Sequence, residues 1–274
     1  MQAFKKRTVV ITGAGSGIGE ALAEQMALSG AIIVVADINK KNAANVESKL
    51  RARGLRAHAM SVDVSDAASV QTLVDSVVKQ HGCLDYFVNN AGIDVAGEVR
   101  DLTLADWEKV IDVDLNGVIY GTVAAYKQMV QQKSGHIVNV ASGAGLIAFP
   151  TSIPYTTAKA GVIGLTRSLR AEAMDLGIQV TLVCPGMVET PLFDNGITRN
   201  VDRRKFLSVL PGKPISTRRA ARIIARGIAE NKPEITFPEG HRAGAWLLNL
   251  IPPLAAYTRA DIVKKFRAMR QSSD

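Results

Sequence analysis

Tyr155 and Lys159 are the residues of this chain whose types and spacing are best suited to proton chemistry. They stand four positions apart, so on a helix both side chains lie on one face and within reach of each other. A lysine ammonium beside a phenol favours the phenolate and brings a group that ionises at about pH 10 toward neutral pH. The spacing predicts a tyrosine that can act as an acid or a base. The same pattern is common on exposed helices, so its meaning depends on the rest of the chain.

A glycine-rich run lies near the N-terminus, between an apolar segment and a helical one. It reads Thr12-Gly-Ala-Gly-Ser-Gly-Ile-Gly19. Glycines allow a tight turn and a close approach to a pyrophosphate, whose charge the next helix N-terminus attracts. The register is not Gly-x-Gly-x-x-Gly, because Ile18 replaces the third glycine, and no Gly-Lys-Ser/Thr sequence indicates a phosphate-hydrolysing loop. We predict that a dinucleotide is bound by Gly13, Gly15, Ser16, Gly17, Ile18 and Gly19.

Asp37 ends the second apolar segment, where an acidic residue can bind the hydroxyl groups of an adenosine ribose. Its carboxylate would repel a 2′-phosphate, so it favours NAD over NADP. No Lys or Arg interrupts the glycine run to reverse this preference. The nearby Lys40 and Lys41 leave NADP as an alternative, and a helix-capping role for Asp37 is the structural alternative.

Short apolar segments alternate with longer amphipathic ones along the chain, and the apolar segments do not alternate with polar residues. The strands expected are 8–12, 31–36, 56–62, 84–88, 135–141, 178–183 and 234–237. The helices expected are 17–29, 40–53, 67–81, 104–131, 155–176 and 217–230. This order predicts an α/β fold with a doubly wound, Rossmann-type parallel sheet of about seven strands and helices on both faces. Residues 186–214 lack periodicity and are expected to form a lid or binding loop.

Composition narrows the class of protein further. The chain has 274 residues, 47% of them hydrophobic, which suits one large domain, residues 1–240, with a C-terminal helical extension, 241–274. Two cysteines and four scattered histidines predict neither a disulfide scaffold nor a metal site. The first expected strand begins at Thr8, which leaves no room for a signal peptide and predicts a cytoplasmic protein.

The net charge of +8 lies entirely in the last part of the chain. Residues 1–195 hold 17 Lys and Arg against 19 Asp and Glu, whereas residues 196–274 hold 16 against 6. The same region contains the apolar run 243–251, which is too short to cross a bilayer and is stopped by Pro252 and Pro253. An apolar run flanked by cations predicts contact with a membrane surface or an anionic carrier such as coenzyme A, the alternative being a subunit interface. No reader motif for nucleic acid accompanies the charge.

Further motifs follow in order between Thr8 and Thr190. They are the glycine run, Asp63-Val64, Asn89-Asn90-Ala91-Gly92, Asn116, Ser142, Tyr155 with Lys159, and Pro185-Gly186 followed by Thr190. Each motif is weak alone, but the set in this order is specific, and by it the chain resembles the short-chain dehydrogenase/reductase family, in its common single-domain branch. Beyond Thr190 the resemblance fades.

The resemblance implies a role for each of these residues. Tyr155 would be the general acid or base, and Lys159 would lower its pKa and bind the nicotinamide ribose. Ser142 would orient the substrate oxygen, and Asn116 would hold a water that relays protons to Lys159. Further cofactor contacts are implied for Asp63, Val64, Asn90, Ala91, Gly92, Pro185, Gly186, Val188 and Thr190.

The resemblance also implies a substrate pocket and an assembly. Leu146 and Phe149 lie between the serine and the tyrosine, and Met187 and Phe193 lie in the expected lid. These side chains indicate a largely apolar secondary alcohol or ketone of hydroxysteroid, retinoid, long-chain or acyl type. Members of the family commonly form homodimers or homotetramers.

The sequence thus predicts an NAD(H)-dependent oxidoreductase that transfers a hydride between nicotinamide and such an alcohol or ketone. The first alternative is an NADP-dependent carbonyl or 3-oxoacyl-thioester reductase, against which Asp37 counts. The second is a dinucleotide-sensing regulatory protein without turnover. A binding role alone does not require Asn116, Ser142, Tyr155 and Lys159 together.

Overall fold

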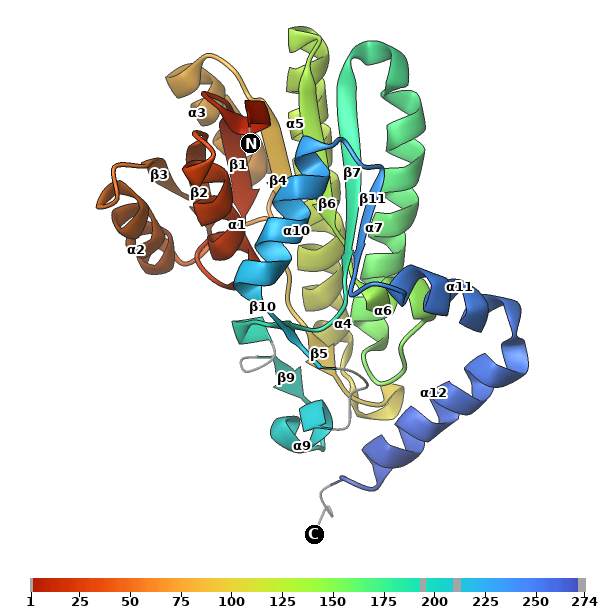
Figure 1. The fold of residues 1–274 in the computed structure, drawn as a ribbon. Helices are drawn as coiled ribbons and strands as arrows, with labels where there is room; N and C mark the ends of the chain where they lie inside the picture. The colour runs from red at the N-terminus through yellow and green to blue at the C-terminus, as the bar shows by residue number, and fades with distance from the viewer. Residues whose placement is uncertain (1, 193–195, 209–212, 271–274) are drawn as a thin grey trace.

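The computed structural model describes residues 2–192, 196–208 and 213–270. Its centre is a seven-stranded sheet in which every neighbouring pair of strands is parallel (Figure 1). This confirms the predicted doubly wound fold. In spatial order the strands are β11 (Glu234–Phe237), β7 (Ile178–Pro185), β6 (Gly135–Val140), β4 (Tyr86–Asn89), β1 (Thr8–Thr12), β2 (Ile32–Asp37) and β3 (Arg56–Ser61).

Helices cover both faces of the sheet, which explains why its strands are apolar without alternation. Along β1, Val9 and Ile11 pack on one face and Val10 packs on the other. The first face is covered by α1 (Gly17–Leu28), α2 (Lys40–Arg51) and α10 (Thr217–Ala229). The second is covered by α3 (Ala67–His81), α5 (Gly117–Gln132) and α7 (Ile153–Glu172).

The segment expected to be one long helix, 104–131, is not continuous. It consists of α4 (Leu104–Ile111), one turn of π-helix (Asp112–Asn116) and then α5. In the π turn the N–H of Gly117 donates to the carbonyl of Asp112, five residues back, so the turn holds one more residue than an α-helical turn. That extra residue changes which side chains of this segment face α7.

The expected lid, 186–214, contains short regular elements in its described part. Strand β8 (Val188–Glu189) pairs with β10 (Ile215–Ser216), and β9 (Ile197–Thr198) pairs with β5 (Val95–Ala96). A short helix, α9 (Arg203–Ser208), follows β9. These elements were not predicted, because two-residue strands paired with distant partners leave no periodicity in the sequence.

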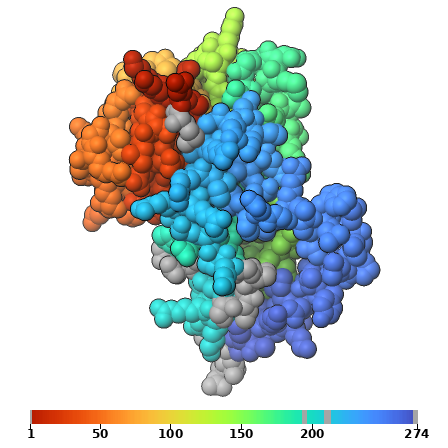
Figure 2. Space-filling view, in the orientation of Figure 1, coloured from red at the N-terminus to blue at the C-terminus, as the bar shows by residue number. Residues whose placement is uncertain are grey.

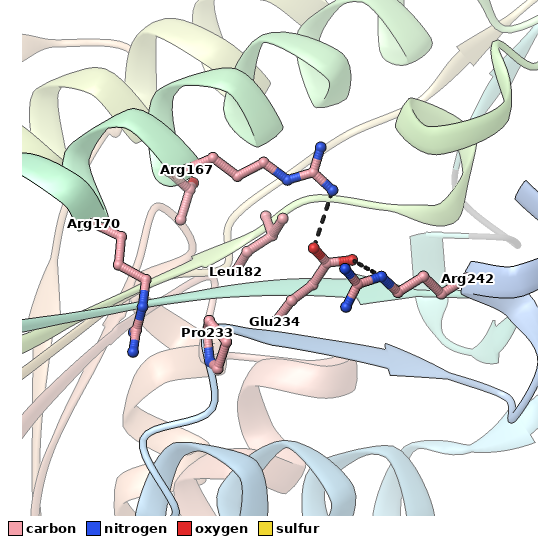
Figure 3. Close-up of a pocket in the computed structure, with 7 residues that line it drawn as sticks. Arg167, Arg170, Leu182, Pro233, Glu234 and Arg242 are labelled. Carbon is pink, nitrogen blue, oxygen red and sulfur yellow. Dashed lines mark hydrogen bonds and ion pairs between the residues drawn. The ribbon is translucent and has the colours of Figure 1, made fainter. Parts of the chain in front are cut away.

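After Gly240 the chain forms α11 (His241–Leu250) and α12 (Pro252–Arg267), which stand out from the body as a lobe (Figures 1 and 2). Ion pairs between side chains attach the start of α11 to the body. Figure 3 shows a pocket in which Arg242 of α11 and Arg167 of α7 both point to Glu234 of β11, at 3.7 and 3.0 Å. This pocket includes none of the predicted site residues.

The far end of the extension is attached by packing and by further ion pairs. Phe266 is fully buried, and its ring meets the Phe206 ring of α9 edge-on at 5.3 Å. Arg267 and Arg270 pair with Glu98, and Arg270 also pairs with Asp101. In the described part of the chain, no helix is both long and apolar enough to cross a membrane.

Candidate active site

The glycine run forms a tight turn between β1 and α1. Gly13 and Gly17 adopt positive φ angles of 63° and 59°, which side chains other than glycine disfavour. A Cβ atom on Gly15 would lie 2.8 Å from Oδ2 of Asp37, and one on Gly19 would collide with the carbonyl of Gly13. The turn therefore requires glycine at these positions, and it leaves its backbone close to the end of β2.

Asp37 is fixed by the backbone around it. Its Oδ2 accepts from the N–H of Gly15 at 2.8 Å, and its Oδ1 accepts from the N–H of Asn39 at 2.8 Å. Asn39, not Asp37, caps α2. The structure thus places the carboxylate against the glycine turn and excludes the alternative that it merely caps the next helix.

The segment after β4 lies on the other side of the turn. The side-chain amide of Asn90 donates to the carbonyls of Thr12 and Gly13, so it joins the ends of β4 and β1. A Cβ on Gly13 would lie 2.8 Å from Cα of Ala91, which shows how closely the two segments pack. The neighbouring Asn89 is buried and bonded to Asn139, a purely structural position.

The remaining predicted cofactor residues lie at the ends of other strands. After β3, Oδ1 of Asp63 accepts from both N–H and Oγ of Ser65, and Val64 packs close to Gly117 of α5. After β7, a Cβ on Gly186 would lie 2.9 Å from Pro238. Of the predicted cofactor residues in this part of the chain, Pro185 and Val188 are buried. Thr190 lies near the glycine turn, since a Cβ on Gly17 would be 3.4 Å from it.

Three of the four predicted catalytic residues meet at one end of the sheet. Ser142 follows β6 and caps α6 (Gly143–Ile147), while Tyr155 and Lys159 lie on the first turns of α7. The Lys159 ammonium is 5.5 Å from the centre of the Tyr155 ring and donates to the Val140 carbonyl at 3.2 Å. Oγ of Ser142 accepts from the N–H of Ala144 at 3.2 Å.

The fourth predicted residue, Asn116, does not join them. Its side-chain amide donates to Oδ1 of Asp112, on the same helical segment. The residue facing Lys159 is Asp114, whose Oδ2 lies 2.9 Å from the Lys159 ammonium. The water-mediated role expected for Asn116 stays a prediction, and direct contact with Lys159 is made by a side chain two residues earlier, on the opposite side of the helix.

Asp114 is fully buried, and the ammonium of Lys159 is almost fully buried. Burial raises the pKa of Asp114 above its ordinary value, while the charge of Lys159 acts in the opposite direction. An acidic residue inside an expected long helix, seven residues after Trp107, carries no signal of this kind. The one sequence signal that could have found Asp114 is its position two residues before Asn116, which places the two side chains on opposite sides of a helix.

The pKa of Tyr155 is raised well above its ordinary value. Burial is the largest cause, the charge of Asp114 adds to it, and the hydrogen bond with Ser142 opposes both. The spacing of Tyr155 and Lys159 predicts a lowered pKa. The direction is reversed here because the phenol is desolvated and Lys159 is paired with a carboxylate.

A second acidic residue near the tyrosine also escaped sequence reasoning. Asp94 lies 3.5 Å from Arg203 of α9. Burial raises the pKa of Asp94 to about 6, and the charge of Arg203 opposes this. The expected lid therefore brings a guanidinium, and not only apolar side chains, toward the site.

The predicted substrate residues fall in different surroundings. Leu146 packs against the cluster around Val162, and its carbonyl accepts from Asn249 of α11. Phe149 packs against Phe206 and Phe266, between the lid and α12. Met187 is partly buried and its carbonyl accepts from Ile215, whereas Phe193 lies outside the described residues.

Comparison with known proteins shows the class to which this fold belongs. Residues 7–200 match the family model described as short chain dehydrogenase. The chain belongs to this family, whose members are oxidoreductases of alcohols and ketones.

Two curated relatives and one solved structure illustrate the likeness. The chain is 39% identical over 191 residues, 70% of its length, to (2S)-[(R)-hydroxy(phenyl)methyl]succinyl-CoA dehydrogenase subunit BbsD of Thauera aromatica, of which 77% is covered. It is 41% identical over 192 residues to cis-4-hydroxycyclohexanecarboxylate dehydrogenase of Sinomonas cyclohexanicum, with 70% and 77% covered. A short chain dehydrogenase/reductase from Burkholderia phymatum in complex with NAD superposes with a TM-score of 0.85 at 29% identity, covering 93% of this chain and 96% of that one.

Proposed function

We propose that this protein oxidises a largely apolar secondary alcohol, or reduces the matching ketone, with NAD(H) as the hydride carrier. The observation that carries the proposal is the cluster of Ser142, Tyr155 and Lys159 at the edge of the sheet that also holds the glycine turn. In a parallel sheet this edge, where the strands end, is where ligands bind.

The turn fits a dinucleotide because backbone, and not side chains, forms its surface. Gly13, Gly15, Gly17 and Gly19 allow the tight turn that leads into the start of α1, where a pyrophosphate would bind, and Asp37 would bind the adenosine ribose. When bound, the nicotinamide would accept or give the hydride. Asp63, Val64, Asn90, Ala91 and Gly92 would line the adenosine side, and Pro185, Gly186, Val188 and Thr190 the nicotinamide side.

The protein's own part in the reaction is to move and hold a proton. In alcohol oxidation Tyr155 takes the hydroxyl proton, and in ketone reduction it returns that proton to the oxygen. Ser142 orients the same oxygen by a hydrogen bond, and Lys159 holds the cofactor ribose beside the tyrosine. The low exposure around Lys159 strengthens these interactions because water screens them little.

Two observations bear on the substrate. The names of both curated relatives describe a secondary alcohol on or beside a carbon ring, together with a succinyl-CoA group in the first and a carboxylate in the second. In this chain Leu146, Phe149 and Met187 supply apolar surface, and Arg203 is the cation nearest to Asp94 in the lid. We therefore place ring-bearing secondary alcohols first, ahead of long-chain alcohols, retinoids and 3-hydroxyacyl thioesters.

The test is a screen of these four alcohol classes with NAD and with NADP, read by absorbance of the reduced nicotinamide. We expect kcat/KM to be about tenfold or more higher with NAD, because Asp37 repels a 2′-phosphate. Asp37→Ser should reduce that ratio, and the matched control Asp66→Ser, at the cap of α3, should leave it unchanged. A preference for NADP would favour the reductase alternative, and cofactor binding without any turnover would favour the regulatory one.

We also propose that the apolar side of α11 and α12 contacts a second copy of the chain. Trp246 and Leu250 lie one turn apart and are 64% and 56% exposed. Several basic residues expected to attract an anionic surface are paired within the chain: Arg267 and Arg270 with Glu98, and Lys265 with Asp261. That pairing favours a subunit contact over a membrane surface or an anionic carrier.

Light scattering of the full chain and liposome flotation separate these alternatives. The double variant Trp246→Glu with Leu250→Glu should lower the oligomeric mass. Met174→Glu, at a position 73% exposed elsewhere, serves as the control and should not. Flotation of the unaltered chain with anionic vesicles, lost in the double variant without a change of mass, would instead support the membrane alternative.

A further inference from the structure

Asp114 occupies a place that the proposed mechanism does not use. It lies in the π turn between α4 and α5, and its side chain has no exposed surface. Its Oδ1 accepts from the N–H of Ile93 at 2.8 Å, and its Oδ2 lies 2.9 Å from the ammonium of Lys159. The carboxylate is thus held between the segment after β4 and the helix that carries the tyrosine.

The surrounding chain is shaped to allow this contact. A Cβ on Gly92 would lie 2.9 Å from Oδ2 of Asp114 and 3.4 Å from the Lys159 ammonium. A side chain at position 92 would therefore separate the two charges. On the other side, the Val140 carbonyl accepts from the same ammonium. Lys159 is therefore held by two groups, the Val140 carbonyl and the carboxylate of Asp114.

We propose that Asp114 is a positioning residue that fixes Lys159 and cancels its charge, so that Tyr155 works beside a neutral acid–lysine pair and not beside a lone cation. The proposal deepens the proposed function, on which it rests for its kinetic consequence. Its electrostatic part, the effect of Asp114 on the ionisation of Tyr155, concerns the protein alone. A buried carboxylate paired with lysine keeps the ammonium in place but removes most of its attraction for a phenolate.

Other charges near the tyrosine have to be considered with this pair. They come from three further elements: Asp94 follows β4, Cys184 lies on β7, and Arg203 on α9 pairs with Asp94. Asp94 and Cys184 both act to raise the pKa of the phenol, and they remain unchanged when Asp114 is altered. An effect of Asp114 substitution is therefore separable from theirs.

The first test measures the phenol itself without a reaction. Tyr155 is replaced by difluorotyrosine, which is more acidic than tyrosine and so ionises where the protein is folded, and its titration is followed by ¹⁹F NMR in the cofactor-free protein. In Asp114→Asn, which keeps the acceptor for Ile93, we expect ionisation about one pH unit or more below that of the parent. Asp112→Asn, two residues away, should leave the titration unchanged.

The second test is the pH dependence of kcat/KM for alcohol oxidation with NAD. Oxidation needs the phenolate, so the rate rises with pH through the tyrosine ionisation. Asp114→Asn should move this acid limb to lower pH by a similar amount, and Asp114→Glu should restore it toward the parent. NADH binding, measured by fluorescence, should change by less than about threefold, since Asp114 lies behind Lys159.

The two tests fail separately. If no alcohol is oxidised by the unaltered chain, the proposed function fails, while the NMR titration still decides the role of Asp114. A phenol titration in Asp114→Asn equal to or above that of the parent overturns the inference, because Asp114 then carries no effective charge. If that variant lacks native near-ultraviolet circular dichroism, Asp114→Ser removes the same charge with a smaller side chain and is measured in its place.

Discussion

The motif-bearing edge of the sheet buries charged groups, whereas the C-terminal extension exposes large apolar ones. At the edge, Lys159 and Asp114 are buried and paired inside the fold. In the extension, Trp246 and Tyr257 are 64% and 74% exposed, and its arginines bind acidic residues on the surface of the body. The edge is therefore a place where burial sets chemistry, and the extension is a surface attached by a few contacts.

The largest effect expected from this contrast lies at the edge. Tyr155→Phe removes the proton carrier and should lower kcat by about 10²- to 10⁴-fold while NADH binding survives. Steady-state kinetics with fluorescence titration measure both quantities. The exposed Tyr257→Phe is the control and should leave kcat unchanged. Near-normal turnover in Tyr155→Phe would remove Tyr155 from the mechanism and with it the contrast between the two regions.

The next largest effect is expected at Phe266, which anchors the extension. Phe266→Ala leaves a cavity against Phe206 and should weaken the docking of α12 by about 3 kcal/mol. Faster proteolysis after α11, with little change in the unfolding midpoint of the body, is the expected result. Unfolding of the whole chain at a much lower temperature would show that the extension is part of the core, contrary to the comparison.

Acid should release the same end of the extension. Hydrogen bonds from Arg267 are the largest cause that lowers the pKa of Glu98, to about 2 from an ordinary 4.5, with Arg100 and Arg270 contributing. Because the folded pKa is depressed, the stabilisation is present above about pH 4.5 and is lost as the pH falls toward 2. Proteolysis across this range tests it. The variant Glu98→Gln should show the released pattern already at pH 7.

The smallest effect is expected on α10. Arg226 pairs with Glu230 at 2.8 Å, but the two side chains are 77% and 40% exposed. Exposed pairs of this kind contribute little, so Arg226→Ala should leave the thermal unfolding midpoint unchanged within error. A clear loss of stability there would show that this exposed pair stabilises the fold more than its exposure indicates.

Much of the fold could be predicted because its signals are local. The sheet strands were recognised by continuous apolar runs, and β1, β11 and α3 have the bounds that were expected. The π turn at Asp112–Asn116 was missed since a change of hydrogen-bond spacing alters no residue type. The paired strands of the lid were missed because their partners lie far away in sequence.

The site was predictable to the same degree. The glycine turn and Asp37 lie in contact, because one strand–helix–strand unit joins them, and their binding of a cofactor stays a prediction. Asn116 was expected to reach Lys159 through a water, and this stays a prediction, whereas the residue in direct contact with Lys159 is Asp114. The two residues are two positions apart, and which of them faces Lys159 depends on how this helical segment packs on α7.

By itself the sequence determined which chemistry is available: a glycine turn and a tyrosine four residues before a lysine, both fixed by spacing along one element. Only the tertiary structure decided how that chemistry is tuned. Asp114 and Lys159 are 45 positions apart in the sequence, and they meet because two helices pack on the same face of the sheet. Burial then gives their charges an effect on Tyr155 that no local pattern encodes.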